Sequence, residues 1–240
     1  MKKLICFDLD GTLTQHRTPL TQDTADFLKK LEKKYADGSM SEKRYRHTLE
    51  VEKMAARLGA LFVPKKENVL RAAALLHDVT KEYSADLQIA MAEKYKIELT
   101  ELDRCAPKTL HAMTAAASIA YDHPEFNNSE VVSAVRWHTT GRAGMTICEK
   151  LVYLADYIDM TRTFDDCVKL REYFFCDGLE DMSESERLRH LDKTLLISYD
   201  MTLVGLIEKK APVSPDTIAA RNELAVKFCL EKIAEKKNKN

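Results

Sequence analysis

The sequence predicts an all-α protein, a helical bundle that carries a short strand and helix at its N-terminus. Glycine and proline are scarce, with seven and six among 240 residues, which favours long helices joined by short connections. Beyond about residue 40, apolar residues recur at helical spacing through almost the whole chain. A chain of this length can bury a substantial core.

The predicted elements begin with a buried strand at 3–9 (KLICFDL) and a helix from Thr21 to about Tyr35, capped by Thr21 or Asp23. The turn sequence Asp37-Gly38-Ser39 separates a leader, residues 1–38, from a main domain, residues 39–240. Further helices are expected at about 41–61, 68–80, 86–94, 109–121, 130–138, 147–158, 184–209 and 215–236.

The composition excludes several classes of partner and location. Lys and Arg number 37 and Asp and Glu 38, so no overall field favours a nucleic acid polymer or an anionic membrane. No apolar run approaches the ~20 residues of a membrane span. Asp8 and Asp10 interrupt the apolar start, which argues against a signal peptide. Six scattered cysteines without a CxxC pair predict reduced thiols in the cytoplasm.

The doublet His77-Asp78 stands inside the apolar run AAALLHDVTK. A neutral histidine bonded to a carbonyl would account for His77. A buried carboxylate at Asp78 needs a cation or several hydrogen-bond donors. The doublet therefore predicts a metal ligand.

Four further residues are candidate ligands, and each has an ordinary alternative. His47 could be a surface histidine, and Asp156, in LVYLADYID, could bond a tyrosine hydroxyl. His111 and His138 could cap their helices. Together with the doublet, however, they form a set of imidazoles and carboxylates that suits one or two divalent ions, and Asp78 could bridge two of them.

Three basic residues stand near these candidates in the sequence. Lys81 follows Asp78 by three positions, on the same side of a predicted helix, and Arg162 follows Asp156 by six. Arg142 lies in the glycine-flanked segment TTGRAG. Each could be a solvated surface charge, but their clustering beside ligand candidates favours contact with phosphate.

The order His…His-Asp…Asp on separate helices resembles the HD superfamily of metal-dependent phosphohydrolases. One branch, the YqeK-type symmetrical diadenosine tetraphosphate hydrolases, is similar from about residue 40 to about 225. The segments that carry this resemblance are KRYRHTLEVEKMAARL, AALLHDVTKEY, LHAMTAA, AVRWHTTGRAGMT, LVYLADYIDMTRTF and SPDTIAARN. WHTTGR together with ADYI distinguishes this branch from other HD proteins.

The resemblance implies an HD-domain helical bundle, a bacterial cytoplasmic enzyme, and a divalent metal cofactor with one or two ions. Iron is the expected metal, with manganese, cobalt and zinc as alternatives. A metal-activated hydroxide would split the dinucleotide into two molecules of ADP.

The resemblance also implies roles for individual residues. The expected metal ligands are His47, His77, Asp78 and Asp156. Asp78, Lys81, His111 and His138 are the expected catalytic residues. Substrate contacts are expected from His47, Asp78, His111, His138 and Asp156, and from Arg44, Val79, Thr80, Lys81, Thr139, Arg142 and Arg162. The segment SPDTIAARN is expected near the base or ribose. Whether His111 and His138 bind metal or give a proton to the leaving ADP stays open.

Other functions remain as alternatives: an HD enzyme for another nucleoside polyphosphate or an alarmone, or a nucleotide sensor without turnover. The expected partner is a dinucleoside polyphosphate substrate, and a homodimer is left open.

The leader segment ICFDLDGTLT resembles the first motif of haloacid-dehalogenase-type phosphatases, in which Asp8 would be the nucleophile and Asp10 the acid and base. That enzyme needs a parallel sheet of several more strands, which a leader of roughly 40 residues cannot supply. We expect a fused leader, and an aspartyl-phosphate phosphatase is the last alternative.

Overall fold

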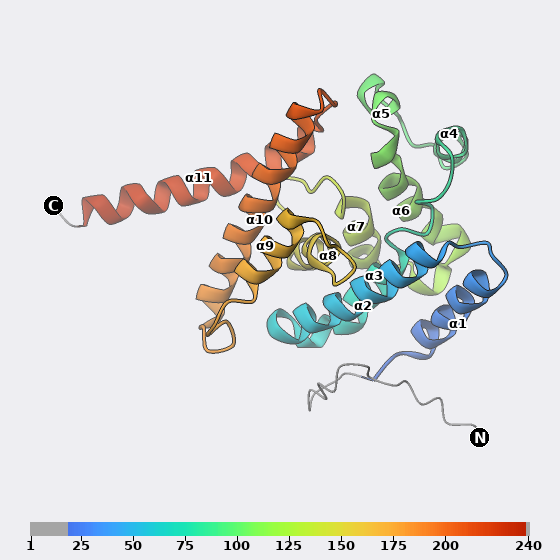
Figure 1. Cartoon of the computed structure of the whole chain (residues 1–240), viewed down its shortest axis with the longest axis horizontal. Helices are drawn as coiled ribbons and strands as arrows, with labels where there is room; N and C mark the ends of the chain where they lie inside the picture. Colours follow the sequence, from blue (N-terminus) through green and yellow to red (C-terminus); the bar gives the residue numbers. More distant parts are fainter. Residues whose placement is uncertain (1–18, 239–240) are drawn as a thin grey trace.

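The computed structural model describes residues 19–238, and this part of the chain consists of helices joined by turns (Figure 1). It confirms the predicted all-α class. The strand predicted at 3–9 and the motif with Asp8 and Asp10 lie outside the described residues. The helices are α1 (Gln22–Ala36), α2 (Glu42–Phe62), α3 (Glu67–Leu76), α4 (Ala85–Lys94), α5 (Glu101–Cys105), α6 (Leu110–Asp122), α7 (Ser129–Trp137), α8 (Ile147–Ile158), α9 (Asp165–Phe174), α10 (Glu184–Glu208) and α11 (Pro215–Lys237), with single 3-10 turns η1 (Pro64–Lys66), η2 (Pro107–Thr109) and η3 (Pro124–Phe126).

Helix starts follow the residues that the sequence marks as caps. The Thr21 hydroxyl accepts a hydrogen bond from the backbone of Thr24, and the Ser41 hydroxyl accepts one from the backbone of Arg44. Helix α8 has the predicted bounds, 147–158, and begins with a capping box between Thr146 and Glu149.

Helix α3 is shorter than predicted. It ends at Leu76, and residues 77–83 form successive turns in which Lys81 N–H donates to the Asp78 carbonyl at 3.0 Å. The doublet therefore stands at a helix end, and the expectation that Lys81 continues the helix was wrong.

Helices α5 and α9 were not predicted from the sequence. Helix α9 carries Asp165 and Asp166 in its first turn, where the helix dipole favours negative charge, and it buries Leu170 and Phe174. The helix start accounts for this acidic pair.

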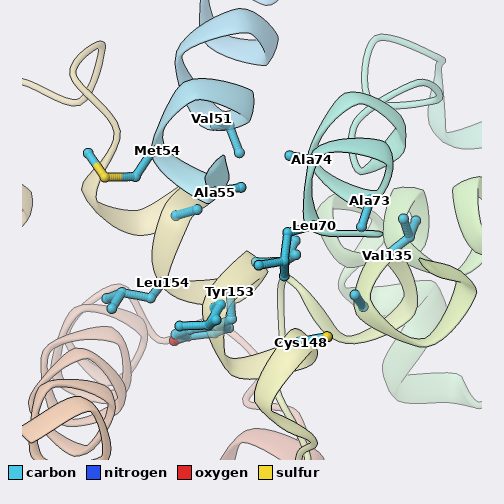
Figure 2. Packing of buried hydrophobic residues seen from close by; sticks show 14 of the residues in the cluster. Val51, Met54, Ala55, Leu70, Ala73, Ala74, Val135, Cys148, Tyr153 and Leu154 are labelled. Carbon is cyan, nitrogen blue, oxygen red and sulfur yellow. The ribbon is translucent and has the colours of Figure 1, made fainter. Parts of the chain in front are cut away.

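Helices α2, α3, α7 and α8 pack around one hydrophobic core. Figure 2 shows their side chains directed toward one another around Leu70. Val51 of α2, Val135 of α7 and Leu154 of α8 are, like Leu70, fully buried. Because this core fixes four helices, it also fixes the polar residues at their ends.

Helix α1 packs on this body although it belongs to the predicted leader. Phe27 and Leu31 are buried in the same core cluster, and the Phe27 ring meets the rings of Phe126 and His123 edge-on at 5.6 and 5.1 Å. The domain boundary at residue 38 stays a prediction.

The C-terminal helices are tied to the body by a buried carboxylate. Asp192 of α10 pairs with Lys150 of α8 and Lys227 of α11, each at 2.7 Å. The end of α11 extends away from the body (Figure 1). Among the described helices, none combines the length and apolarity needed to cross a membrane.

The packing of Phe27 predicts that α1 unfolds together with the helical body. Phe27→Ala should lower the free energy of unfolding by about 3 kcal/mol and leave one cooperative transition in urea, followed by circular dichroism. Exposed Lys33 on the same helix provides the control, because Lys33→Ala should change stability by less than about 0.5 kcal/mol. Wild-type stability of Phe27→Ala would contradict this packing.

Candidate metal centre

Asp78 stands at the centre of four imidazoles. Its Oδ1 lies 3.1 Å from Nε2 of His111 and 3.6 Å from Nε2 of His138. Its Oδ2 lies 3.3 Å from Nε2 of His77 and 3.6 Å from Nε2 of His47. Residues from α2, α6 and the ends of α3 and α7 thus converge on one carboxylate.

Asp156 of α8 completes this cluster. Its Oδ1 lies 3.0 Å from Nε2 of His47 and 3.9 Å from Nε2 of His77. Two sets of three residues have ligand atoms within 4.8 Å of one another and could each hold an ion. The sets are His47, His77 and Asp156, and His77, Asp78 and His138.

Three of the four histidines place Nδ1 against a backbone carbonyl and direct Nε2 into the cluster. In each, Nδ1 lies at hydrogen-bonding distance from the carbonyl three positions earlier, which requires the proton on Nδ1. The pairs are His77 with Ala74 at 2.5 Å, His111 with Lys108 at 2.8 Å, and His138 with Val135 at 2.6 Å. The Nε2 lone pairs remain for a cation. His77 can therefore donate a hydrogen bond to a backbone carbonyl and also bind a metal.

The charge state of the cluster suits a divalent metal. Burial opposes ionisation of Asp78, but the surrounding imidazoles, His77 first and then His111 and His138, hold the pKa of that carboxyl well below its usual range. Burial lowers the pKa of His111 to about 4 and also lowers the pKa of His138, which keeps both neutral. Oδ1 of Asp78 is buried and accepts no hydrogen bond of regular geometry from the described residues. An ionised, buried carboxylate beside neutral imidazoles is the donor set that a divalent cation satisfies.

His47 holds a proton for the same reason that it could hold a metal. Burial lowers its pKa, but Asp156 and Asp159 outweigh this effect and raise it to about 9. The alternative that His47 is a surface histidine is not found, since the residue is only 6% exposed. Carboxylates on both sides of the ring attract a cation to it.

Three cationic side chains surround the carboxylates. Arg44 forms an ion pair with Asp78, and Nη2 of Arg162 lies 2.5 Å from Oδ1 of Asp156. Nζ of Lys81 lies 3.0 Å from Nε2 of His111 and 3.9 Å from Oδ1 of Asp78. Burial lowers the pKa of Lys81.

Thr139 also reaches the cluster, whereas some other predicted contacts are directed elsewhere. Its hydroxyl lies 3.0 Å from Nε2 of His138. The buried Thr80 hydroxyl donates to the carbonyl of His111, and Arg142 donates to the fully buried carboxylate of Glu149, both at 3.0 Å.

Two more predicted segments have clear positions. Val79 is half-buried and packs against the hydrophobic core. In SPDTIAARN, the Thr217 hydroxyl donates to the Thr140 carbonyl at 2.8 Å, so the start of α11 lies beside the segment that follows His138.

Sequence reasoning missed Asp159, which is fully buried and has its Oδ2 3.3 Å from Nδ1 of His47. One signal could have found it. It follows Asp156 by three residues at the C-terminal end of a helix, where the dipole disfavours a carboxylate unless something else stabilises it.

Comparison with known proteins identifies the family that this chain matches. The HD domain family matches residues 44–161. Two curated relatives named "Bis(5'-nucleosyl)-tetraphosphatase, symmetrical" are each 30% identical to this chain. The protein of Staphylococcus aureus aligns over 79% of this chain and 91% of its own length, and that of Bacillus subtilis over 77% and 91%. A crystal structure from Clostridium acetobutylicum, described as a predicted HD superfamily hydrolase involved in NAD metabolism, superposes with a TM-score of 0.70 at 28% identity, covering 87% of this chain and all of that one.

The cluster predicts that a divalent ion stabilises the protein through Asp78. Mn²⁺ at about 100 times its dissociation constant should add about 2.7 kcal/mol, or roughly 5–10 °C in Tm, to the chelator-treated protein. Asp78→Asn should lose most of this shift in differential scanning fluorimetry, because it removes the central charge.

Asp192→Asn is the matched control, since it also neutralises a buried carboxylate but one that pairs with lysines in another part of the body. Its Tm should still rise with Mn²⁺. An equal rise in Asp78→Asn would place the ion elsewhere.

Proposed function

Because this chain belongs to the HD-domain family that includes the symmetrical bis(5'-nucleosyl)-tetraphosphatases, we propose that it hydrolyses diadenosine tetraphosphate to two molecules of ADP. The observation that carries the proposal is the convergence of His47, the doublet His77-Asp78 and Asp156 on one buried centre. The similarity to two named relatives over 91% of their length supports the substrate.

We propose that His47, His77, Asp78 and Asp156 hold a divalent metal, with iron as the expected ion. When bound, such an ion supplies a Lewis acid that makes water nucleophilic near neutral pH and offsets the charge on phosphate. The chain itself supplies ionised carboxylates and imidazoles whose orientation the protein fixes before the substrate arrives.

The cations around the cluster suit a chain of phosphates. Arg44, Lys81 and Arg162 each contact a carboxylate or imidazole of the centre. Their side chains are 15%, 34% and 34% exposed, so each keeps some surface accessible to a ligand. A guanidinium can clamp a phosphate through two hydrogen bonds, and Lys81 would act as a point charge.

His111 and His138 have two possible roles that the same geometry supports. Together with Asp78 they could hold a second ion, because both direct Nε2 toward its Oδ1. Otherwise one of them, with Thr139 beside it, would first take up a second proton on Nε2, which its lowered pKa disfavours, and then give that proton to the leaving ADP oxygen. We keep both as proposals.

Other expectations remain proposals of the same kind. They are the contacts of Val79, Thr80 and Arg142 with substrate, the cytoplasmic location, and a homodimer. An enzyme for another nucleoside polyphosphate or an alarmone is the second candidate.

The proposal predicts that ADP is the only nucleotide product. Metal-loaded protein incubated with diadenosine tetraphosphate should give two ADP per substrate consumed, measured by ion-exchange chromatography. ATP together with AMP would contradict symmetrical cleavage, and a panel of nucleoside polyphosphates and alarmones would reveal a preferred alternative.

Two variants locate the activity in that assay. Asp78→Ala should lower kcat/KM by roughly 10²-fold or more, about 2.7 kcal/mol or more in the activation barrier, because it removes a ligand of the proposed metal. Asp8→Asn in the leader should leave turnover unchanged. Loss of activity in Asp8→Asn alone would instead support the phosphatase alternative. Tight substrate binding without turnover would favour a sensor.

A further inference from the structure

His47 differs from the other three histidines in what faces its Nδ1 atom. His77, His111 and His138 each place Nδ1 against a backbone carbonyl. Nδ1 of His47 faces side chains instead: Oδ2 of Asp159 at 3.3 Å and the hydroxyl of Thr161 at 3.2 Å. One imidazole of the four is therefore backed by a full negative charge.

The two oxygens of Asp159 have different surroundings. Oδ1 accepts hydrogen bonds from the Thr161 backbone N–H, at 2.7 Å, and from the Thr161 hydroxyl. Oδ2 accepts no regular hydrogen bond from the described residues, and it has Nδ1 of His47 at 3.3 Å and Nε of Arg162 at 3.4 Å. This fully buried oxygen therefore has the ring and guanidinium of two basic side chains as its neighbours, while the Thr161 hydroxyl lies between Nδ1 of His47 and Oδ1.

The loop that carries Asp159 is held in place by Arg171 of α9. Its guanidinium donates to the carbonyls of Ile158 at 2.6 Å and Arg162 at 2.8 Å, and also to that of Asp159. These bonds satisfy carbonyls left free where α8 ends. The position of the carboxylate therefore does not depend on His47.

From this geometry we propose that Asp159 is a positioning residue for His47. It fixes the proton on Nδ1, orients Nε2 toward Asp156 and the doublet, and strengthens Nε2 as a donor to a cation. The inference rests on the metal centre of the proposed function. A carboxylate behind a ligating histidine restrains the ring and raises its basicity, which a carbonyl does to a smaller degree.

An isosteric change tests this role because Asp159 needs two acceptor atoms. Asp159→Asn keeps the shape but must turn its NH₂ group either toward the Nδ1–H of His47 or toward the donors of Thr161. We expect the affinity for Mn²⁺, measured by electron paramagnetic resonance of the free ion without nucleotide, to fall about 10–100-fold. Asp192→Asn, the control with another buried carboxylate, should bind Mn²⁺ as the wild type does.

The His47→Ala background separates positioning from general damage. If Asp159 acts through His47, Asp159→Asn should weaken Mn²⁺ binding by less than about threefold when His47 is already absent. Equal losses in both backgrounds, or no loss in the wild-type background, would overturn the inference.

A measurement on the wild-type protein tests the same role even if a variant fails to fold. With ¹⁵N-labelled histidine and diamagnetic Zn²⁺, long-range NMR correlations should show His47 protonated on Nδ1, and a proton on Nε2 would overturn the inference. The Mn²⁺ and NMR experiments need no substrate. If they give the expected results but the protein forms no ADP, only the proposed reaction is refuted.

Discussion

The ionised carboxylate of Asp78, buried among four imidazoles, is the interaction on which the rest of the site depends. A buried charge of this kind is stable only beside opposite charge or a cation. Its neighbours come from α2, α6 and the ends of α3 and α7, with Asp156 from α8. The hydrophobic core that packs α2, α3, α7 and α8 together therefore also determines the geometry of the polar centre.

The charges of the centre are nearly balanced within the protein. Asp78, Asp156 and Asp159 face the cations of Arg44, Lys81 and Arg162. Each of these cations contacts a carboxylate that a metal would also use. A bound ion would compete for those contacts and leave the guanidinium and ammonium groups freer to meet phosphate, so metal binding and substrate binding are expected to support each other.

Local signals in the sequence predicted much of this structure. The cap at Ser41 and the run from Ile147 to Ile158 gave helices with the expected bounds, because capping and helical spacing act over a few residues. The end of α3 was misplaced, since the turns after His77 carry no Gly or Pro signal. Asp159 was missed because its partner lies on α2, and the neighbouring bond between His47 and Thr161 spans 114 positions. Contacts over such separations are set by tertiary packing, which a single sequence does not display.

The most direct test of the shared cation is an anomalous difference map from crystals of the protein purified with its own metal, collected above and below the absorption edge of iron. We expect a peak within about 2.5 Å of ligand atoms from His47, His77, Asp78 and Asp156, the bonding range of divalent ions in proteins. A peak at another place in the molecule, with these four side chains free of any ion, would contradict it.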